Sequence, residues 1–248
     1  MSPSKSPSKV VADDQDSSPK SPAVEQHPGR ETVRSFLKRA RAAYGRTALC
    51  LSGGGMLANY HYGVIKALLE EDCLPRIISG TSAGSVVGAL VCTRSDEELM
   101  RDLDPVILSP KQACFSRSWM ERMKSVYKTG YMFDGDEWYR MLQWFTLGDT
   151  TFEEAYKKTG RILCISLSAT TKKAPPVLLT YITAPNVVIA SAIVASAAVP
   201  GFIKPVRLKV KDANGVVTEP IGDKGQTYWD GSIRQDIPTS GLAEMLNW

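Results

Sequence analysis

The chain has 248 residues, a formal net charge of +4 and 43% hydrophobic residues, values typical of one α/β domain with its own core. No apolar run reaches the roughly 18 to 20 residues that a membrane span needs, and the N-terminus lacks the apolar region of a secretory signal. The five cysteines are scattered and the two histidines form no cluster with them, so the sequence predicts neither a disulfide framework nor a metal site.

The charge surplus is confined to one short segment. Residues 1–30 hold four basic and four acidic side chains, and residues 47–248 hold 21 of each. The surplus lies in 31–46, where five basic residues accompany a single acidic one, Glu31. A broad basic surface is therefore not predicted, and no nucleic-acid partner is expected.

Two segments precede the main part of the chain. Residues 1–30 are rich in Ser, Pro and Lys and are predicted to be a disordered tail. In 31–45, apolar residues recur at helical spacing between basic ones, which predicts a basic amphipathic helix, the stub of an upstream region. This helix would lie on a lipid surface or dock on a protein domain. The second arrangement is favoured, because a basic amphipathic helix is a weak indication of lipid binding.

From Arg46 onward the pattern alternates between strands and helices. Thr47–Leu51 is a short apolar run that ends in three glycines, and a helix is expected over about 57–71. Arg76–Ser79 is a second short strand, and the glycine-containing turn after it leads into a helix that ends near Thr93. This alternation predicts an α/β fold whose parallel sheet is covered by helices on both faces.

Two further helix starts are marked by capping boxes. Ser95 and Glu98 have the required spacing, and so do Thr151 and Glu154. In such a box the first side chain accepts a hydrogen bond from the backbone N–H of the second residue, whose side chain reaches back in return. Helices are therefore expected to begin just after Ser95 and Thr151.

Residues 105–148 are dense in Met, Trp, Tyr and Phe. Such side chains suit a wall or cap over an acyl pocket, and a helical subdomain with its own core is at least as good an interpretation. Farther along, strands are expected at Ile162–Leu167 and Val177–Ile182, a helix of small residues at 186–198, and a hairpin around the turn at Asp212–Gly215.

The pentapeptide Gly80-Thr81-Ser82-Ala83-Gly84 fits the nucleophile-elbow pattern G-x-S-x-G. A nucleophile held between a strand and a helix needs a strained, sharp turn, with small neighbours that let other chain segments approach. The helix that follows offers N–H donors and the positive end of its dipole. Because the strand and the helix are both present, Ser82 is predicted to be a catalytic nucleophile. The alternative is a glycine-rich turn of a nucleotide-binding fold.

A serine nucleophile needs a base, and histidine is the usual one. His27 lies in the predicted tail, and His61 lies on the helix before the serine, where a structural role is more frequent. No histidine follows Ser82, so an ordinary Ser-His-Asp hydrolase is disfavoured. The base is therefore expected to be a carboxylate, whose pKa burial can raise into a useful range.

Two aspartates compete for the role of base. Asp230 follows an aromatic pair at a predicted strand end and precedes Gly231 and Ser232, which places it on a tight turn. Asp236 stands just ahead of an Ile-Pro pair, where a turn or cap role is more common. Asp230 is therefore preferred.

The glycine run Gly53, Gly54 and Gly55 follows a strand and precedes a helix, so its N–H groups can point into one cavity. With the N–H of Ala83 they are predicted to form an oxyanion hole, in which each donor is worth about 3 kcal/mol. A dinucleotide loop would need glycine where Ala58 stands, and a P-loop would need a G-K-[ST] triplet that the chain lacks. No nucleotide and no other cofactor is expected.

In their order along the chain, these motifs resemble the patatin-like phospholipases, and most closely the fungal patatin-type triacylglycerol lipases of lipid droplets and their plant seed-oil relatives. The matching blocks are Gly45–Leu49, Leu51–Gly55, His61–Val64, Pro75–Gly84, Thr151–Tyr156, Ala195–Gly201 and Tyr228–Ser232. The resemblance implies a three-layer α/β/α patatin-like fold with a mostly parallel central sheet over 46–248. It also implies that Ser82 and Asp230 form a catalytic dyad.

The same resemblance implies hydrolysis of acyl esters of triacylglycerol, phospholipid or both, at a lipid-droplet or membrane surface. It suggests an intracellular, peripheral location and leaves protein partners undefined. Two features depart from the wider family. Met56 and its neighbours stand where a basic residue usually follows the third glycine, and the dyad triplet ends in Ser232 rather than Gly or Ala.

A C-terminal truncation is also expected, because the lipid-droplet lipases extend farther. Two alternatives remain open on the same site. One is a lysophospholipid acyltransferase, and the other is an inactive, truncated fragment that only binds lipid.

Overall fold

The computed structural model describes residues 33–37, 47–112, 119–171, 174–219 and 226–246. The chain forms two compact units, Met1–Tyr44 and Gly45–Trp248. In the first unit, residues 33–37 are helical with exposed side chains. The remainder of the predicted helix at 31–45 and the predicted tail at 1–30 lie outside the described residues.

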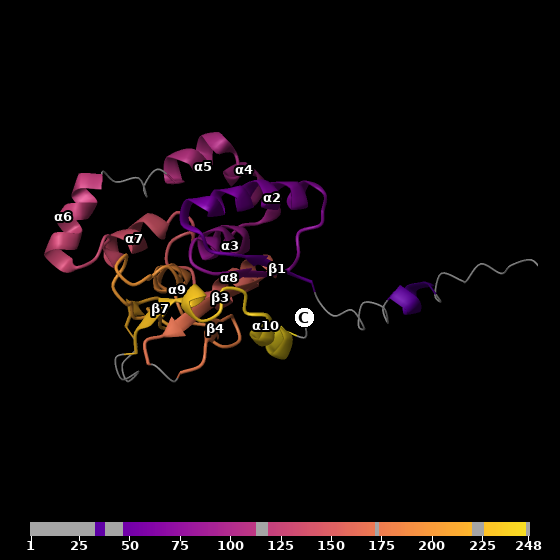
Figure 1. Cartoon of the computed structure of the whole chain (residues 1–248). Coiled ribbons are helices and arrows are strands. Elements are labelled where there is room, and N and C mark those ends of the chain that lie inside the picture. Colours follow the sequence, from indigo (N-terminus) through magenta and orange to yellow (C-terminus); the bar gives the residue numbers. More distant parts are fainter. Residues whose placement is uncertain (1–32, 38–46, 113–118, 172–173, 220–225, 247–248) are drawn as a thin grey trace, which may run out of the picture. The chain divides into compact units, whose positions relative to one another are not determined.

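The centre of the second unit is a five-stranded sheet in which β1, β2, β3 and β4 are neighbours in that order and β7 also pairs with β3 (Figure 1). The strands are β1 (Ala48–Leu51), β2 (Ile77–Gly80), β3 (Ile162–Ala169), β4 (Val177–Leu179) and β7 (Tyr228–Asp230). β1, β2 and β3 run parallel, whereas β4 and β7 run antiparallel to β3. The carboxyl ends of β1 and β2, where the glycine run and the pentapeptide begin, therefore lie side by side.

The register of β3 fixes where the C-terminal strand ends. Leu167 pairs with β4 on one edge and with Asp230 of β7 on the other. Ile165, two residues earlier, pairs with Gly80 of β2 on one edge and with β4 on the other. β7 therefore continues the edge that β2 occupies, and Asp230 lies just beyond the carboxyl end of β2.

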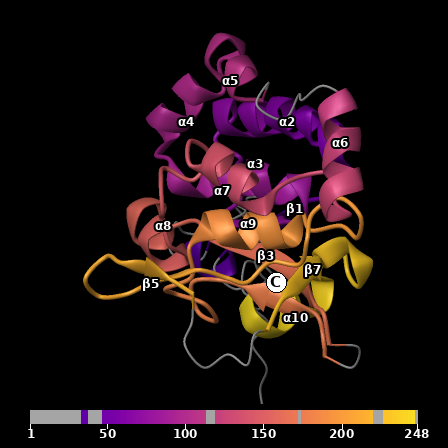
Figure 2. The same ribbon diagram turned by 90° about the vertical axis from the view of Figure 1, so that its left-hand side faces the viewer.

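Helices surround this sheet. They are α2 (Asn59–Glu70), α3 (Ala83–Thr93), α4 (Asp96–Asp102), α5 (Pro105–Gln112), α6 (Trp119–Thr129), α7 (Gly135–Leu142), α8 (Phe152–Thr159), α9 (Ile189–Ser196) and α10 (Thr239–Leu246), with short 3-10 turns η1 (Gly55–Ala58) and η3 (Gly231–Ile233). Figures 1 and 2 both place α9 between α7 and β3, and both contacts are close.

The two faces of the sheet carry separate apolar clusters. On one face, Ile78 and Leu163 belong to the large core built with α3 and α9. On the other, Ile77 and Ile162 pack with Leu242 of α10. Side chains alternate between the faces because successive residues of a strand point in opposite directions. Helices on both faces of a mostly parallel sheet confirm the predicted three-layer α/β/α fold.

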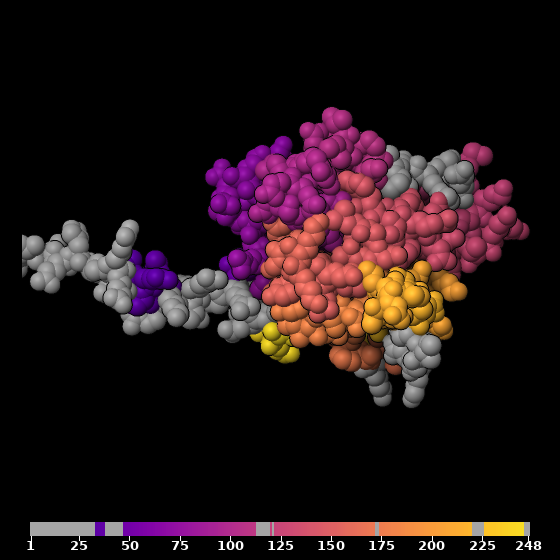
Figure 3. All heavy atoms as spheres, turned by 180° about the vertical axis from the view of Figure 1, so that it is seen from behind, coloured from indigo at the N-terminus to yellow at the C-terminus, as the bar shows by residue number. Residues whose placement is uncertain are grey.

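In its described residues, the aromatic-rich segment 105–148 forms α5, α6 and α7 without a separate core. Leu108, Leu142 and Phe145 are buried in the same cluster as the sheet, which contradicts the subdomain interpretation. In the space-filling view, the pink part of this segment lies directly against the orange second half of the chain (Figure 3).

Buried Arg94 anchors the end of this segment. Its Nε donates to Asp102 Oδ2 at 2.6 Å, and its terminal nitrogens donate to the carbonyl oxygens of Phe145 and Trp144 at 2.9 and 2.7 Å. A buried guanidinium needs such a full set of partners, because an unpaired buried charge is costly. The loop after α7 is thereby held against the helices that follow β2.

Several predicted local elements are present, and two of them are shorter than predicted. Both capping boxes are present, at Ser95 and Thr151. The predicted hairpin is the pair β5 (Val210–Lys211) and β6 (Val217–Thr218). The strand expected to reach residue 182 ends at Leu179, because Thr180 begins a turn closed by hydroxyl hydrogen bonds. The helix expected from 186 begins at Ile189, since Val187 and Val188 make isolated bridges with neighbouring segments.

Candidate active site

Ser82 occupies a strained turn between β2 and α3. Its backbone has φ 51° and ψ −126°, and it is the N-cap of α3. Within the described ranges, the other non-glycine residues with positive φ are Asp72 and Leu147. A serine in this conformation costs free energy that the surrounding structure must offset, and such residues cluster at functional sites. Its side chain is partly exposed, so the hydroxyl can meet a substrate.

The flanking glycines are required by close backbone approach. A Cβ at Gly80 would lie 2.6 Å from the carbonyl oxygen of Gly84, and a Cβ at Gly84 would overlap the carbonyl oxygen of Leu51 at the end of β1. Any larger residue would push β1, β2 and α3 apart. The pentapeptide therefore forms the sharp strand–turn–helix connection that the nucleophile-elbow pattern predicts.

Two serines that the sequence analysis did not single out support the turn. The Ser82 N–H donates to Ser196 Oγ at 2.9 Å, and Ser196 Oγ donates to the carbonyl oxygen of Ser166 in β3 at 2.9 Å. Both supporting serines are buried. In the sequence, each of these serines stands within an otherwise apolar strand or helix. A buried hydroxyl at such a position needs a hydrogen-bond partner, and this requirement could have indicated both residues.

Asp230 lies fully buried at the end of β7. Its N–H donates to the carbonyl oxygen of Ala198 at 3.0 Å, and its Oδ1 accepts from the N–H of Ser232 at 2.8 Å. A side chain at Gly231 would overlap the Ser166 carbonyl, so the turn after Asp230 requires glycine there. The predicted dyad triplet, Asp230, Gly231 and Ser232, thus forms a compact cap around one carboxylate oxygen.

Burial raises the pKa of Asp230, while hydrogen bonding from the Ser82 side chain and from Ser232 opposes that rise. The other oxygen, Oδ2, is buried, and no donor in the described part of the chain makes a full hydrogen bond to it. The Ser82 side chain is thus a neighbour of the Asp230 carboxyl group, whose Oδ2 has no hydrogen-bond partner among the described residues. An unsatisfied buried carboxylate oxygen next to a serine hydroxyl can accept that hydroxyl's proton.

The glycine run packs against the same turn. A Cβ at Gly53 would lie 3.1 Å from the Ser82 Cβ. Gly54 and Gly55 have φ values of 125° and 59°, which favour glycine. The N–H groups of Gly54, Gly55 and Ala83 make no hydrogen bond within the described ranges, whereas the Gly53 N–H donates to Asp236 Oδ1 at 3.3 Å. Three of the four predicted oxyanion donors are therefore unengaged.

His61 has a structural contact. Its Nε2 lies 3.1 Å from the carbonyl oxygen of Ser52, the residue before the glycine run. The ring therefore ties the first turn of α2 to the end of β1. This contact agrees with the structural role favoured from the sequence.

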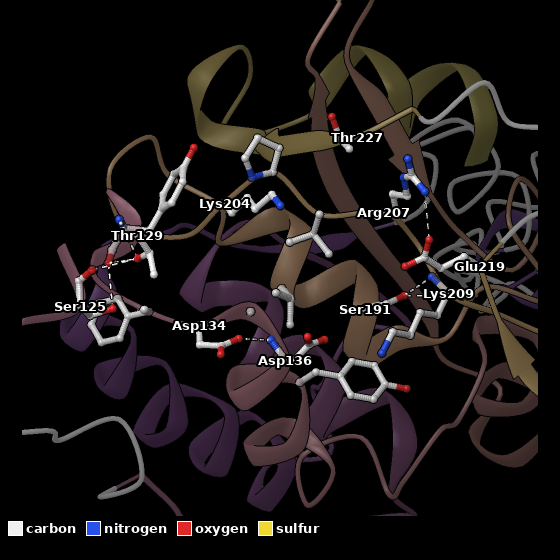
Figure 4. A pocket seen from close by; sticks show the side chains of 17 residues that line it. Ser125, Thr129, Asp134, Asp136, Ser191, Lys204, Arg207, Lys209, Glu219 and Thr227 are labelled. Carbon is white, nitrogen blue, oxygen red and sulfur yellow. Dashed lines mark hydrogen bonds and ion pairs between the residues drawn. The ribbon is translucent and has the colours of Figure 1, made fainter. Parts of the chain in front are cut away.

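A cavity of about 740 Å³ lies beside α9 (Figure 4). Ser191 and Val194 of α9 line it, whereas Ser196 of the same helix faces the Ser82 turn. The aromatic-rich segment contributes Tyr131, Phe133 and Tyr139 to its wall. The segment thus forms part of a cavity wall, but Ser82 and Asp230 do not line this cavity, so a wall or cap over an acyl pocket stays a prediction.

The groups around Ser82 on this α/β fold are those that an acyl-transfer site is expected to contain. They are a partly exposed serine on a strained turn, a buried carboxylate, and backbone N–H groups that have no partner among the described residues. Nucleophile, proton acceptor and oxyanion donors are the groups that such a reaction needs. None of the helices in the described ranges combines the length and apolar character of a membrane-crossing segment.

The family model of the patatin-like phospholipases matches residues 49–243, and the chain belongs to this family. A patatin-like phospholipase domain-containing protein of Cryptococcus neoformans is 47% identical over 219 residues, which cover 88% of this chain and 25% of that protein. One of Yarrowia lipolytica is 44% identical over 230 residues, covering 92% and 27%. The chain therefore spans about a quarter of the length of these relatives.

Two solved structures are also similar. VipD from Legionella pneumophila matches with a TM-score of 0.45 and 15% identity, over 78% of this chain and 47% of that one. ExoU from Pseudomonas aeruginosa, in complex with SpcU, matches with a TM-score of 0.39 and 18% identity, over 62% of this chain and 38% of that one.

Proposed function

We propose that this chain is a serine lipid-acyl hydrolase in which Ser82 is the nucleophile and Asp230 the general base. The observation that carries the proposal is the positive φ of Ser82 on a turn that meets the buried carboxylate of Asp230. Membership of the patatin-like phospholipase family supports the class of reaction.

The reaction proceeds in two steps. Ser82 Oγ attacks the ester carbonyl while its proton passes to Asp230, and the N–H groups of Gly54, Gly55 and Ala83 hold the tetrahedral oxyanion. The intermediate collapses, the leaving alcohol takes the proton from Asp230, and an acyl-enzyme remains. Asp230 then takes a proton from water, whose oxygen attacks the acyl carbonyl. As the fatty acid leaves, Asp230 returns this proton to Ser82 Oγ, and both residues are regenerated.

The burial of Asp230 fits the role of base. A carboxylate in water is a weak proton acceptor, and burial raises its pKa toward that of a better one. The backbone conformation of Ser82 serves the same step, because it sets the direction of the Cα–Cβ bond before the substrate arrives.

The proposed substrates are acyl esters of triacylglycerol, phospholipid or both, at a lipid-droplet or membrane surface. Large apolar side chains directly follow the glycine run and are exposed, namely Met56, Leu57, Tyr60 and Val64. Exposed apolar groups next to a reacting serine support a substrate presented by a lipid surface. If lysophospholipid replaced water as the acceptor, the same acyl-enzyme would perform acyl transfer.

A fluorophosphonate probe tests the nucleophile. Wild-type protein is expected to be labelled, Ser82→Ala to lose all labelling, and the control Ser125→Ala, on α6, to keep it. A folded wild type that remains unlabelled would contradict the proposal and leave the inactive fragment as the alternative. Parallel assays on triacylglycerol emulsion and phosphatidylcholine vesicles, with release of fatty acid as the readout, then define the substrate.

A further inference from the structure

Asp236 makes contacts that neither a base nor a simple turn residue requires. It lies between η3 and α10, and its side chain is partly buried. Its Oδ1 accepts from the N–H of Gly53 at 3.3 Å. Its own carbonyl oxygen accepts from the Thr81 hydroxyl at 2.6 Å. The residues it contacts are thus one in the glycine run and one directly before Ser82.

These contacts join three loops that are remote in sequence. Gly53 follows β1, Thr81 follows β2, and Asp236 lies in the segment after β7. The Thr81 hydroxyl also hydrogen-bonds Ser166 Oγ of β3, so the linkage reaches the central strand. Asp236 therefore connects the two loops that hold the oxyanion donors and the nucleophile.

The position of the carboxylate separates Asp236 from the proton-transfer step. Its Oδ1 is directed at the Gly53 amide, and it is Asp230 that has the Ser82 side chain as a hydrogen-bonding neighbour. Since the Gly53 N–H is engaged, it is not an oxyanion donor in this arrangement. The hydrogen bond of Gly53 instead fixes the backbone just before Gly54 and Gly55, whose N–H groups are unengaged among the described residues.

We propose that Asp236 is a positioning residue that fastens the glycine loop to the Ser82 turn and so keeps the Gly54 and Gly55 amides in place for the oxyanion. This inference rests on the proposed acyl-hydrolase function. The essential feature is that the side chain at position 236 accepts a hydrogen bond from the Gly53 N–H. The amide oxygen of an asparagine can accept it in place of the carboxylate oxygen. Oxyanion donors act only when they are held in place before the reaction, and displacement by about 1 Å can cost roughly 100-fold in rate.

The test compares Asp236→Asn with Asp236→Ala on a short-chain p-nitrophenyl ester. Asp236→Asn retains an acceptor and is expected to stay within about threefold of wild type, since one acceptor oxygen replaces another. Asp236→Ala is expected to lower kcat by roughly 100-fold with little change in KM, because the loop loosens while the substrate still binds. The neighbouring Gln235→Ala is the matched control and is expected to behave as wild type.

Backbone hydrogen exchange adds a readout that does not depend on turnover. In a Ser82→Ala background, Asp236→Ala is expected to speed exchange of the Gly53 amide, which loses its acceptor, and Asp236→Asn to leave that exchange unchanged. Loss of activity in Asp236→Asn equal to that in Asp236→Ala would overturn the inference and make the charge itself essential. So would wild-type turnover in Asp236→Ala. Failure of the proposed function shows separately, as a wild type that neither reacts with fluorophosphonate nor turns over ester.

If Asp236→Ala fails to fold, Asp236→Ser replaces it, because a serine hydroxyl is too short to reach Gly53 from the same backbone position. The expected result for that variant is the same loss of kcat and the same faster exchange. Wild-type kcat and exchange in Asp236→Ser would contradict the positioning role.

Discussion

Asp230 is subject to two opposing requirements. A base must be ionised to accept a proton from Ser82, yet full burial disfavours the charged form and raises the pKa of Asp230. The nearby charge of Asp236 adds to that rise, while Ser82 and Ser232 limit it by hydrogen bonding. The proposed base is therefore expected to destabilise the fold at neutral pH.

Asp230→Asn tests both sides of this argument. Removal of the base is expected to lower kcat by about 1000-fold or more. In the wild type, kcat/KM is expected to fall as pH drops through the raised pKa of Asp230, because only the ionised form accepts a proton.

Whereas Asp230→Asn is expected to lower kcat, it is expected to raise the free energy of unfolding at neutral pH. A folded-state pKa above the unfolded value contributes stability that is present below the unfolded pKa and lost as pH rises through the folded pKa. The asparagine variant should therefore be more stable than wild type in urea at pH 7 to 8, and the difference should vanish at acidic pH. Equal urea midpoints throughout, or retained turnover, would contradict the assignment.

At the scale of elements, the connection from β1 through the Ser82 turn to α3 depends on backbone contact. Gly84 has no space for a side chain, because a Cβ would overlap the Leu51 carbonyl. Gly63, in the middle of α2, has nothing within 4 Å of an added Cβ. The two glycines thus provide a matched pair in which only the surroundings differ.

Gly84→Ala is expected to destabilise the protein by about 3 kcal/mol or more, since β1 and α3 must move apart. Gly63→Ala is expected to stabilise it by roughly 0.5 to 1 kcal/mol, because alanine is the better residue in an exposed helix interior. Denaturant unfolding of both variants measures the difference. Similar effects of the same sign would show that the close approach at Gly84 does not limit stability.

Local sequence patterns predicted the helices, strands and turns well, but they could not predict contacts between residues that are distant in the sequence. The capping boxes, the hairpin and the turn at Ser82 each depend on a few neighbouring residues, and all are present. The antiparallel pairing of β7 with β3 depends on residues about 60 positions apart, and no local pattern encodes it. The contact of Asp236 with Gly53 spans 183 residues. A pattern could therefore propose Asp230 and Asp236 as candidates but could not assign their contacts.

At the scale of the whole molecule, the glycine run leads into an uncharged exposed face. Met56 and Leu57 in η1, and Tyr60 and Val64 in α2, have exposed fractions of 68%, 67%, 78% and 50%. Tyr60 and Val64 lie four residues apart and share one side of the helix, opposite buried Tyr62 and Ile65. For a lipid hydrolase, this face would bring the oxyanion donors and Ser82 to a lipid surface.

The double variant Tyr60→Ser/Val64→Ser leaves the glycine loop untouched and is expected to weaken binding to phosphatidylcholine vesicles by about tenfold, since two apolar side chains no longer enter the lipid. Co-sedimentation measures the binding. Hydrolysis of a soluble short-chain ester should remain at the wild-type rate, because neither residue belongs to the catalytic machinery.

The matched control is Tyr127→Ser/Val106→Ser, which removes the same two residue types from exposed positions on α6 and α5. It should bind vesicles as wild type does. If both double variants bound equally well, lipid would not contact the α2 face. If both lost binding to the same extent, the contact would be a general property of exposed apolar residues. Only a loss confined to the Tyr60 and Val64 pair connects lipid binding to the helix that follows the glycine run.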